Sequence, residues 1–190
     1  MNIFRHVLLC ALCASLVVAA GCISVEKKEY RFRMNADGSG AGTIRFVNIV
    51  SSDDNGKDVS FKDFAELVTD YLQGTKFEDD YPALHVTGKK LVEENGQLVG
   101  EVSFTLASFD SAGFFRAAGC DCCPTLFFIS TDKGQETVTE SSGTIITDVA
   151  PSPFIEWQPK SGDLTLKTTL MEDTSNTHAM LSHYRQWAKK

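Results

Sequence analysis

Three cysteines stand within four positions of this sequence, at Cys120, Cys122 and Cys123. Thiolates are ligands for soft metals such as Cu(I) and Zn(II), so the cluster could bind such a metal with a histidine as a fourth ligand. The candidate histidines are His85, His178 and His183. Thiols also exchange disulfides, although this C-x-C-C spacing is not the C-x-x-C of thiol oxidoreductases. The cluster is therefore a candidate for metal binding or redox exchange.

A structural disulfide is the first expectation for such a cluster in an exported protein. Adjacent Cys122 and Cys123 can pair only with strain, so Cys120 with Cys122 or with Cys123 is the better pairing, in a very tight loop. A local pair leaves the third thiol for another partner, and an anoxic host leaves all three reduced. We place the structural role ahead of metal binding, and metal binding ahead of redox exchange.

The first residues indicate export. A short basic head, Arg5 and His6, is followed by a run without charge from Val7 to Ala20, which is the layout of a secretory signal peptide. About 14 apolar residues are fewer than the roughly 20 that a membrane-spanning helix needs. We therefore expect residues 1–21 to be a signal peptide.

The signal ends in Ala19-Ala20-Gly21-Cys22, which resembles the lipobox of bacterial lipoproteins. The resemblance covers only residues 1–22 and implies that the thiol of Cys22 is acylated, that the chain is cut before it, and that lipid anchors the protein to a membrane. Ile23 and Ser24 are not the aspartate that retains many lipoproteins in the inner membrane. The resemblance thus favours the outer membrane where the host has two. A plain secretory signal cut near Ala20 is the alternative.

Removal of residues 1–21 leaves 169 of the 190 residues, enough for one domain with a sizeable core. The whole chain has 18 basic and 25 acidic residues. This acidic balance disfavours nucleic-acid binding and broad adhesion to anionic lipid. We expect a short polar tether over 22–28 and a single domain over 29–190.

Hairpin patterns dominate that domain. Tyr30, Phe32 and Met34 alternate with polar residues, as in a strand with one buried face, and Asp37-Gly38 and Asn95-Gly96 are typical hairpin turns. Further strand-like segments occupy 43–50, 84–107, 125–130, 137–141, 144–149 and 164–170. The pattern predicts an α+β domain with a mainly antiparallel sheet of about eight strands. An all-β sandwich with peripheral helices is the alternative.

Two helices are expected. Ser60 as N-cap with Asp63 forms a capping box for the first helix, and Gly74 ends it. Its apolar stripe, which we expect to pack on the sheet, consists of Phe61, Phe64, Ala65, Val68, Tyr71 and Leu72. A second helix is expected from about His178 to the C-terminus. On one helix His178 and His183 diverge, because they are five positions apart.

No catalytic signature appears: the sequence lacks G-x-S-x-G, H-E-x-x-H, a P-loop and a Rossmann fingerprint in its proper context. Enzymatic activity is therefore not expected, and no cofactor is expected besides the lipid on Cys22. We expect binding or assembly at a membrane surface of the cell envelope, with an envelope protein as partner. The competing interpretation is a metal or thiol protein centred on Cys120, Cys122 and Cys123. A carrier of apolar ligands is a third, suggested only by 13 phenylalanines.

Overall fold

The computed structural model describes residues 23–35, 37–115, 122–128, 136–147, 154–158, 162–171 and 173–189. The predicted signal peptide and Cys22 lie outside these residues, as does Cys120. All statements below concern the described part of the chain.

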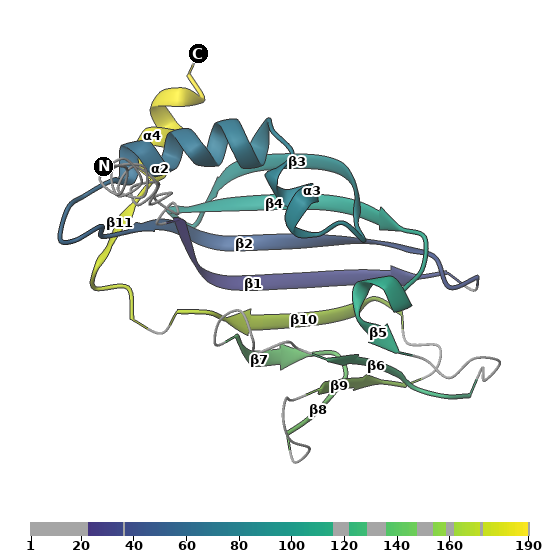
Figure 1. The fold of residues 1–190 in the computed structure, drawn as a ribbon. Coiled ribbons are helices and arrows are strands. Elements are labelled where there is room, and N and C mark those ends of the chain that lie inside the picture. Colours follow the sequence, from purple (N-terminus) through teal and green to yellow (C-terminus); the bar gives the residue numbers. More distant parts are fainter. Residues whose placement is uncertain are drawn as a thin grey trace, which may run out of the picture.

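Most of the domain is antiparallel sheet (Figure 1), as the turn patterns predict. The main sheet has the strand order β3-β4-β2-β1-β10-β7, and β11 pairs with the end of β2. These strands are β1 (Ile23–Met34), β2 (Gly40–Ser52), β3 (His85–Glu94), β4 (Gln97–Leu106), β7 (Thr137–Ser141), β10 (Leu164–Thr169) and β11 (Thr177–Ala179). The α+β prediction is confirmed.

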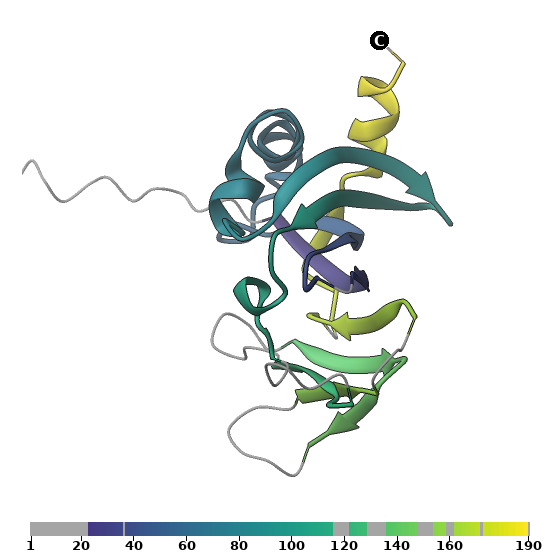
Figure 2. The same cartoon turned by 90° about the vertical axis from the view of Figure 1, so that its right-hand side faces the viewer.

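A smaller sheet lies beyond the β7 edge of the main sheet in both views (Figures 1 and 2). Its order is β5-β6-β9-β8. The strands are β5 (Phe114–Phe115), β6 (Thr125–Phe128), β8 (Thr144–Ile146) and β9 (Phe154–Trp157). The short strands β5, β9 and β11, which the sequence pattern did not predict, raise the number of strands above the expected eight.

Helices cover one face of the main sheet. α2 (Ser60–Glu66) continues directly into the π-helical segment η1 (Leu67–Leu72), and α3 (Lys76–Asp80) follows after a short turn. A 3₁₀ turn, η2 (Asp110–Ala112), precedes β5, and α4 (Leu181–Trp187) ends the domain. Figure 1 shows α2 and η1 running along the sheet, with α4 crossing behind the start of α2.

The expected tether over residues 22–28 is wrong, because β1 begins at Ile23, which pairs with Ser51 of β2. The polar residues of this segment have partners within the fold. Asn48 Nδ2 donates to Glu26 Oε2 at 2.7 Å, and Lys28 Nζ donates to Glu136 Oε2 at 3.3 Å. Their polarity therefore does not indicate a solvated linker.

The expected hairpin turns are confirmed. Asn95 and Gly96 both have positive φ angles, 51° and 75°, as a two-residue hairpin loop requires. Gly38 has φ 85° in the β1–β2 turn. These turn residues set the register of the β1–β2 and β3–β4 hairpins, on which the helices pack.

The start of α2 differs from the predicted capping box. The N-cap position is Val59, and the Ser60 N–H donates to Asp58 Oδ1 at 2.8 Å. The Asp63 side chain turns to β2 and accepts the Ser51 hydroxyl at 2.6 Å. Phe61 was expected on the buried stripe but is 75% exposed. Phe64 and Val68 are buried as expected.

The C-terminal helix begins later than predicted. His178 lies in β11, where it is the register partner of Ser51, and α4 starts only at Leu181. Met180, between the two elements, is fully buried. The segment expected as one helix is therefore a short strand followed by a helix of two turns.

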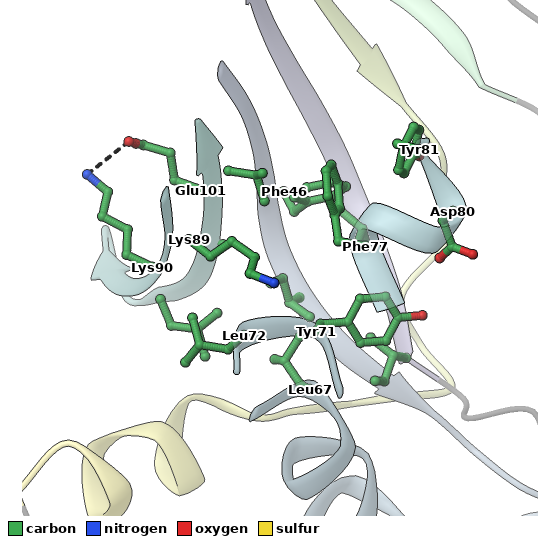
Figure 3. Close-up of a pocket in the computed structure, with 16 residues that line it drawn as sticks. Phe46, Leu67, Tyr71, Leu72, Phe77, Asp80, Tyr81, Lys89, Lys90 and Glu101 are labelled. Carbon is green, nitrogen blue, oxygen red and sulfur yellow. Dashed lines mark ion pairs between the residues drawn. The ribbon is translucent and has the colours of Figure 1, made fainter. Parts of the chain in front are cut away.

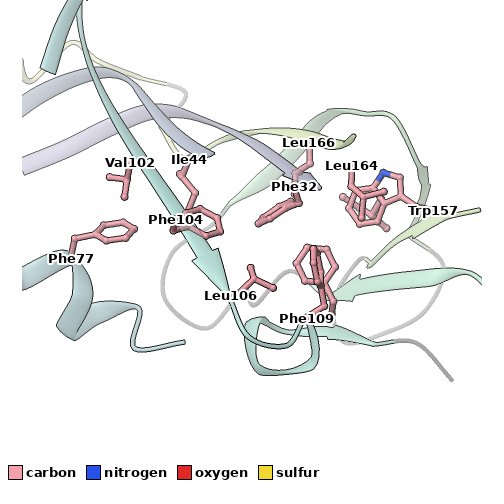
Figure 4. Packing of buried hydrophobic residues seen from close by; sticks show 12 residues of the cluster. Phe32, Ile44, Phe77, Val102, Phe104, Leu106, Phe109, Trp157, Leu164 and Leu166 are labelled. Atoms are coloured by element: carbon pink, nitrogen blue, oxygen red, sulfur yellow. The ribbon is translucent and has the colours of Figure 1, made fainter. Parts of the chain in front are cut away.

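The core consists of two clusters. The first lies around Trp157, Phe104 and Leu166 and extends to Phe77 of α3 (Figure 4). The second joins the buried side of α2 and η1 to β2, β4 and Met180. Phe46 and Tyr71 are partly buried and pack against both clusters.

Candidate functional site

A cavity of about 230 Å³ lies between these two clusters, under η1 and α3 and over the main sheet. Phe77 and Val102 bring the first cluster to its wall, and Ile49 and Leu67 bring the second. Protein interiors are normally packed as tightly as organic crystals, so a gap of this size between two well-formed clusters is a candidate ligand site.

One of the two helical segments in the cavity wall is π-helical. Leu67, Tyr71 and Leu72 line the cavity, and all three belong to η1. π-helical turns are rare and occur often at functional sites. The helix departs from regular α-helical geometry at the segment that faces the cavity, which supports a functional role for this wall.

The sheet side has a glycine at the cavity wall. Gly100 of β4 is the register partner of Phe46. A Cβ added there would lie 3.0 Å from the tip of Ile49, with Leu91 and Phe46 at 3.6 and 3.9 Å. A glycine within a strand commonly marks a close approach of a ligand or another backbone. The absence of a side chain at position 100 allows Ile49, Leu91 and Phe46 to approach the strand backbone closely at the cavity wall.

The cations beside the cavity already have partners. Lys89 Nζ donates to Gly74 O at 2.6 Å and to Glu78 at 3.0 Å, which connects β3 to the end of η1 and to α3. Burial raises the pKa of Glu78, but hydrogen bonds from Lys89 and from the backbone outweigh it, so this pKa lies below its ordinary value. Lys90 pairs with Glu101 at 2.9 Å (Figure 3).

The cavity wall also includes the first described residues of the chain. Ile23 and Val25 of β1 both line it. The residue that follows Cys22 is thus part of the wall, with no linker between them. A flexible tether over residues 22–28 would instead have separated Cys22 from the cavity wall.

Two residues of the cysteine cluster, Cys122 and Cys123, lie in the described part of the chain. Cys123 is disulfide-bonded and Cys122 is exposed. A cysteine in a disulfide is not a thiolate ligand, so the three-thiolate metal site expected from Cys120, Cys122 and Cys123 is not available in this form. A disulfide, one of the alternatives left open by the sequence, is thus present at Cys123; Cys120 lies outside the described residues, so its pairing stays a prediction.

Two histidines that were expected to diverge instead line one open pocket near the start of α2. His183 Nε2 lies 3.2 Å from Ser60 Oγ, while His178 lies 2.5 Å from Asp53 and 3.6 Å from Asp58. The prediction failed because it placed both on one helix. His85 is exposed on β3. Within the described ranges, no group of three or more histidine, cysteine or acidic side chains is placed to hold a metal ion.

A polar cluster lies on the face of β1 that points to the core. Tyr30 donates to Glu136 Oε1 at 2.7 Å, and Thr168 donates to the same oxygen at 2.5 Å. Burial, and then the neighbouring carboxylate, raise the pKa of Tyr30 far above its ordinary value. This cluster satisfies polar groups between β1 and β10, and we assign it a structural role.

Among the phenylalanines that suggested an apolar ligand, Phe114, Phe115 and Phe127 do not line the cavity. Phe114 and Phe127 pack with tilted rings in the first cluster, with ring centroids 4.6 Å apart, and Phe115 is exposed. The signals in the sequence that do belong to the cavity are Gly100 inside a strand pattern and the stripe that ends in Tyr71 and Leu72.

Among the residues that the structure describes, no helix has the length and hydrophobicity needed to cross a membrane. No family model, no curated protein and no solved structure matches the chain. The site is therefore interpreted from its own geometry.

Proposed function

We propose that this chain is a lipid-anchored protein of the bacterial cell envelope that binds a single acyl chain in the cavity under η1. The observation that carries the proposal is the composition of the cavity wall: it is apolar over four strands and two helical segments, and Lys89 and Lys90 at its side are paired. These cations are paired, and Asp80, which also lines the cavity, is exposed to solvent. An apolar ligand in the cavity therefore need not bury an unpaired charge.

The size of the cavity favours a narrow ligand. Sites for drug-sized molecules measure about 300–1,000 Å³, whereas this cavity measures about 230 Å³. A single hydrocarbon chain is slender enough for such a space, and each methylene removed from water contributes about 0.8 kcal/mol. An extended acyl chain can also leave part of its length outside the cavity.

The position of the anchor supports the same ligand class. If Cys22 is acylated, as the lipobox resemblance implies, its neighbour Ile23 in the cavity wall lies at the membrane surface. A ligand drawn from that membrane reaches the cavity without crossing bulk water. We further propose the outer membrane as the site of anchoring in a host with two membranes, since Ile23 and Ser24 follow the cysteine.

A photoactivatable palmitate, with a diazirine near the end of its chain, tests the proposal. The exported wild-type protein, reconstituted in vesicles, is labelled, digested and mapped by mass spectrometry. We expect label on the peptides that contain Phe46, Tyr71 and Leu91, which line the cavity. Label spread evenly over exposed segments would contradict the proposal.

Two glycine variants provide the matched comparison. Gly100→Leu fills the cavity from its wall, whereas the Cβ of Gly88→Leu, on the neighbouring strand β3, meets nothing within 4 Å. We expect labelling to fall several-fold in the first variant and to stay at the wild-type level in the second. Gly100→Ala, which asks only the tip of Ile49 to shift, should give an intermediate loss. Equal labelling of all three variants would overturn the assignment.

A further inference from the structure

One large hydrophobic side chain stands out on the surface of the described residues. Phe61, the second residue of α2, is 75% exposed, more than Phe115 at 56%, Ile145 at 37% or Tyr81 at 36%. Its ring contacts the domain through His183, with centroids 5.7 Å apart in an edge-on arrangement. The Phe61 ring packs against His183 in this arrangement and is exposed over most of its surface, so it is available to a partner.

A short series of contacts connects Phe61 to the place where the chain enters the domain. Ile23 is the register partner of Ser51, and the Ser51 hydroxyl donates to Asp63 in the first turn of α2 at 2.6 Å. Phe61 lies in that same turn. Figure 1 shows the starts of α2 and β1 at one end of the domain, beside β11, with β5 and its Phe115 at the other end.

The charges around Phe61 are mixed. Lys57, Lys62 and Asp58 are exposed near it, and His178 and His183 line the adjoining pocket. A surface of this kind has no strong preference for anionic or cationic partners, whereas an exposed aromatic ring favours the interface between lipid headgroups and acyl chains. A bilayer fits these features without any specific headgroup.

We propose that Phe61 inserts into the surface of the membrane that holds the lipid of Cys22, as a second contact that fixes the orientation of the domain. The inference rests on the anchor in the proposed function, and it is independent of what the cavity binds. The lipid on Cys22 attaches the chain to the membrane at one point, and a second contact fixes how the domain lies on the bilayer. In this orientation Ile23, Val25 and the cavity wall that they form face the lipid.

Tryptophan scanning tests this orientation. Phe61→Trp and Phe115→Trp are compared in the exported full-length protein, bound to phosphatidylethanolamine and phosphatidylglycerol vesicles that contain brominated lipids. The emission of wild-type Trp157 and Trp187 is subtracted. We expect Trp emission at position 61 to fall by about half or more, because an inserted ring lies about 5–10 Å below the surface. Emission at position 115 should be unchanged. Equal quenching at both positions, or quenching only at 115, would overturn the proposal.

Co-sedimentation of each protein with the vesicles tests the lipid anchor separately from the orientation. If wild type and both tryptophan variants sediment with vesicles but position 61 is not quenched, the orientation is wrong and the anchor stands. If the Cys22→Ser protein sediments as wild type does, without a difference in added mass, the anchor is wrong. Phe61→Ser, which removes the ring without burying a polar group, should sediment with wild type through its lipid while losing the fixed orientation.

Discussion

Ile23 and Ser51 are register partners in the main sheet, so the residue that follows Cys22 is already part of a paired strand. Successive Cα atoms are about 3.8 Å apart. An acylated Cys22 would consequently hold the end of the sheet directly against the membrane, with no slack.

Insertion of a flexible ten-residue glycine-serine segment between Cys22 and Ile23 tests this closeness. Such a segment spans roughly 15–20 Å on average. The thermal midpoint should remain at the wild-type value, because pairing starts at Ile23. Quenching of a tryptophan at position 61 should weaken. Unchanged quenching would mean that Phe61 itself, rather than the short connection, holds the domain at the surface.

The buried pair of Ser51 and Asp63 connects β2 to α2. Asp63 is 1% exposed and its Oδ1 has no partner among the described residues, so Ser51 supplies the hydrogen bond that satisfies the other oxygen. Ser51→Ala should lower the free energy of unfolding by about 1–3 kcal/mol, the usual cost of leaving a buried polar group unsatisfied. Urea titration measures the loss.

The neighbouring serine is the control. Ser52 is half-buried and its hydroxyl lies 2.8 Å from that of Ser24. Ser52→Ala should cost less than about 1 kcal/mol, as expected for one neutral hydrogen bond. A larger loss from Ser52→Ala than from Ser51→Ala would contradict the role given to Asp63.

Acid should weaken the start of α2. Hydrogen bonds from the hydroxyl and the backbone N–H of Ser60 lower the pKa of Asp58. A carboxyl group with a depressed pKa in the folded state stabilises the fold above its unfolded pKa of about 3.9, and this contribution is lost as the pH falls below it. Asp58→Asn keeps an acceptor for the Ser60 N–H and should reduce the pH dependence of the thermal midpoint between about pH 5 and 2. An unchanged dependence would exclude Asp58 as its source.

At alkaline pH, Tyr30 should make the fold less stable as the pH rises. Its pKa is raised in the folded state by burial and by Glu136, so its contribution to stability is complete below the unfolded pKa of about 10 and is lost as the pH rises beyond it. Tyrosinate absorbance should show no ionisation of Tyr30 until the chain unfolds. The difference between the titrations of wild type and Tyr30→Phe should therefore be flat over the folded range, and a step near pH 10 in the folded protein would contradict the burial of the phenol.

The sequence predicted those parts of the fold that depend on local patterns. The Asn95-Gly96 turn, the alternation from Tyr30 to Met34 and the buried face at Phe64 and Val68 follow from rules that act over a few residues. The predictions at Lys28 and His178 were wrong because their partners, Glu136 and Asp53, are more than 100 positions away in the chain. Polar residues paired over such distances resemble linker or surface residues when only neighbours are considered.

The candidate site was the least predictable feature. Its wall combines Ile23, Phe46, Tyr71 and Gly100 from four elements, and only the tertiary fold brings them together. In the cysteine cluster, which was the more conspicuous signal, Cys123 forms a disulfide. Gly100 was visible as a glycine within a strand, but without the position of Ile49 it could not be distinguished from a position that merely tolerates glycine.

Mass spectrometry under non-denaturing conditions tests the central claim most directly. Wild type, Gly100→Leu and Gly88→Leu are extracted from their native membrane, and the mass of each folded protein is compared with its mass after denaturation. We expect wild type and Gly88→Leu to carry one acyl-chain lipid that denaturation releases, and Gly100→Leu to carry none. A folded wild-type protein whose mass does not change on denaturation, or a lipid retained equally by Gly100→Leu, would contradict the binding of an acyl chain in this cavity.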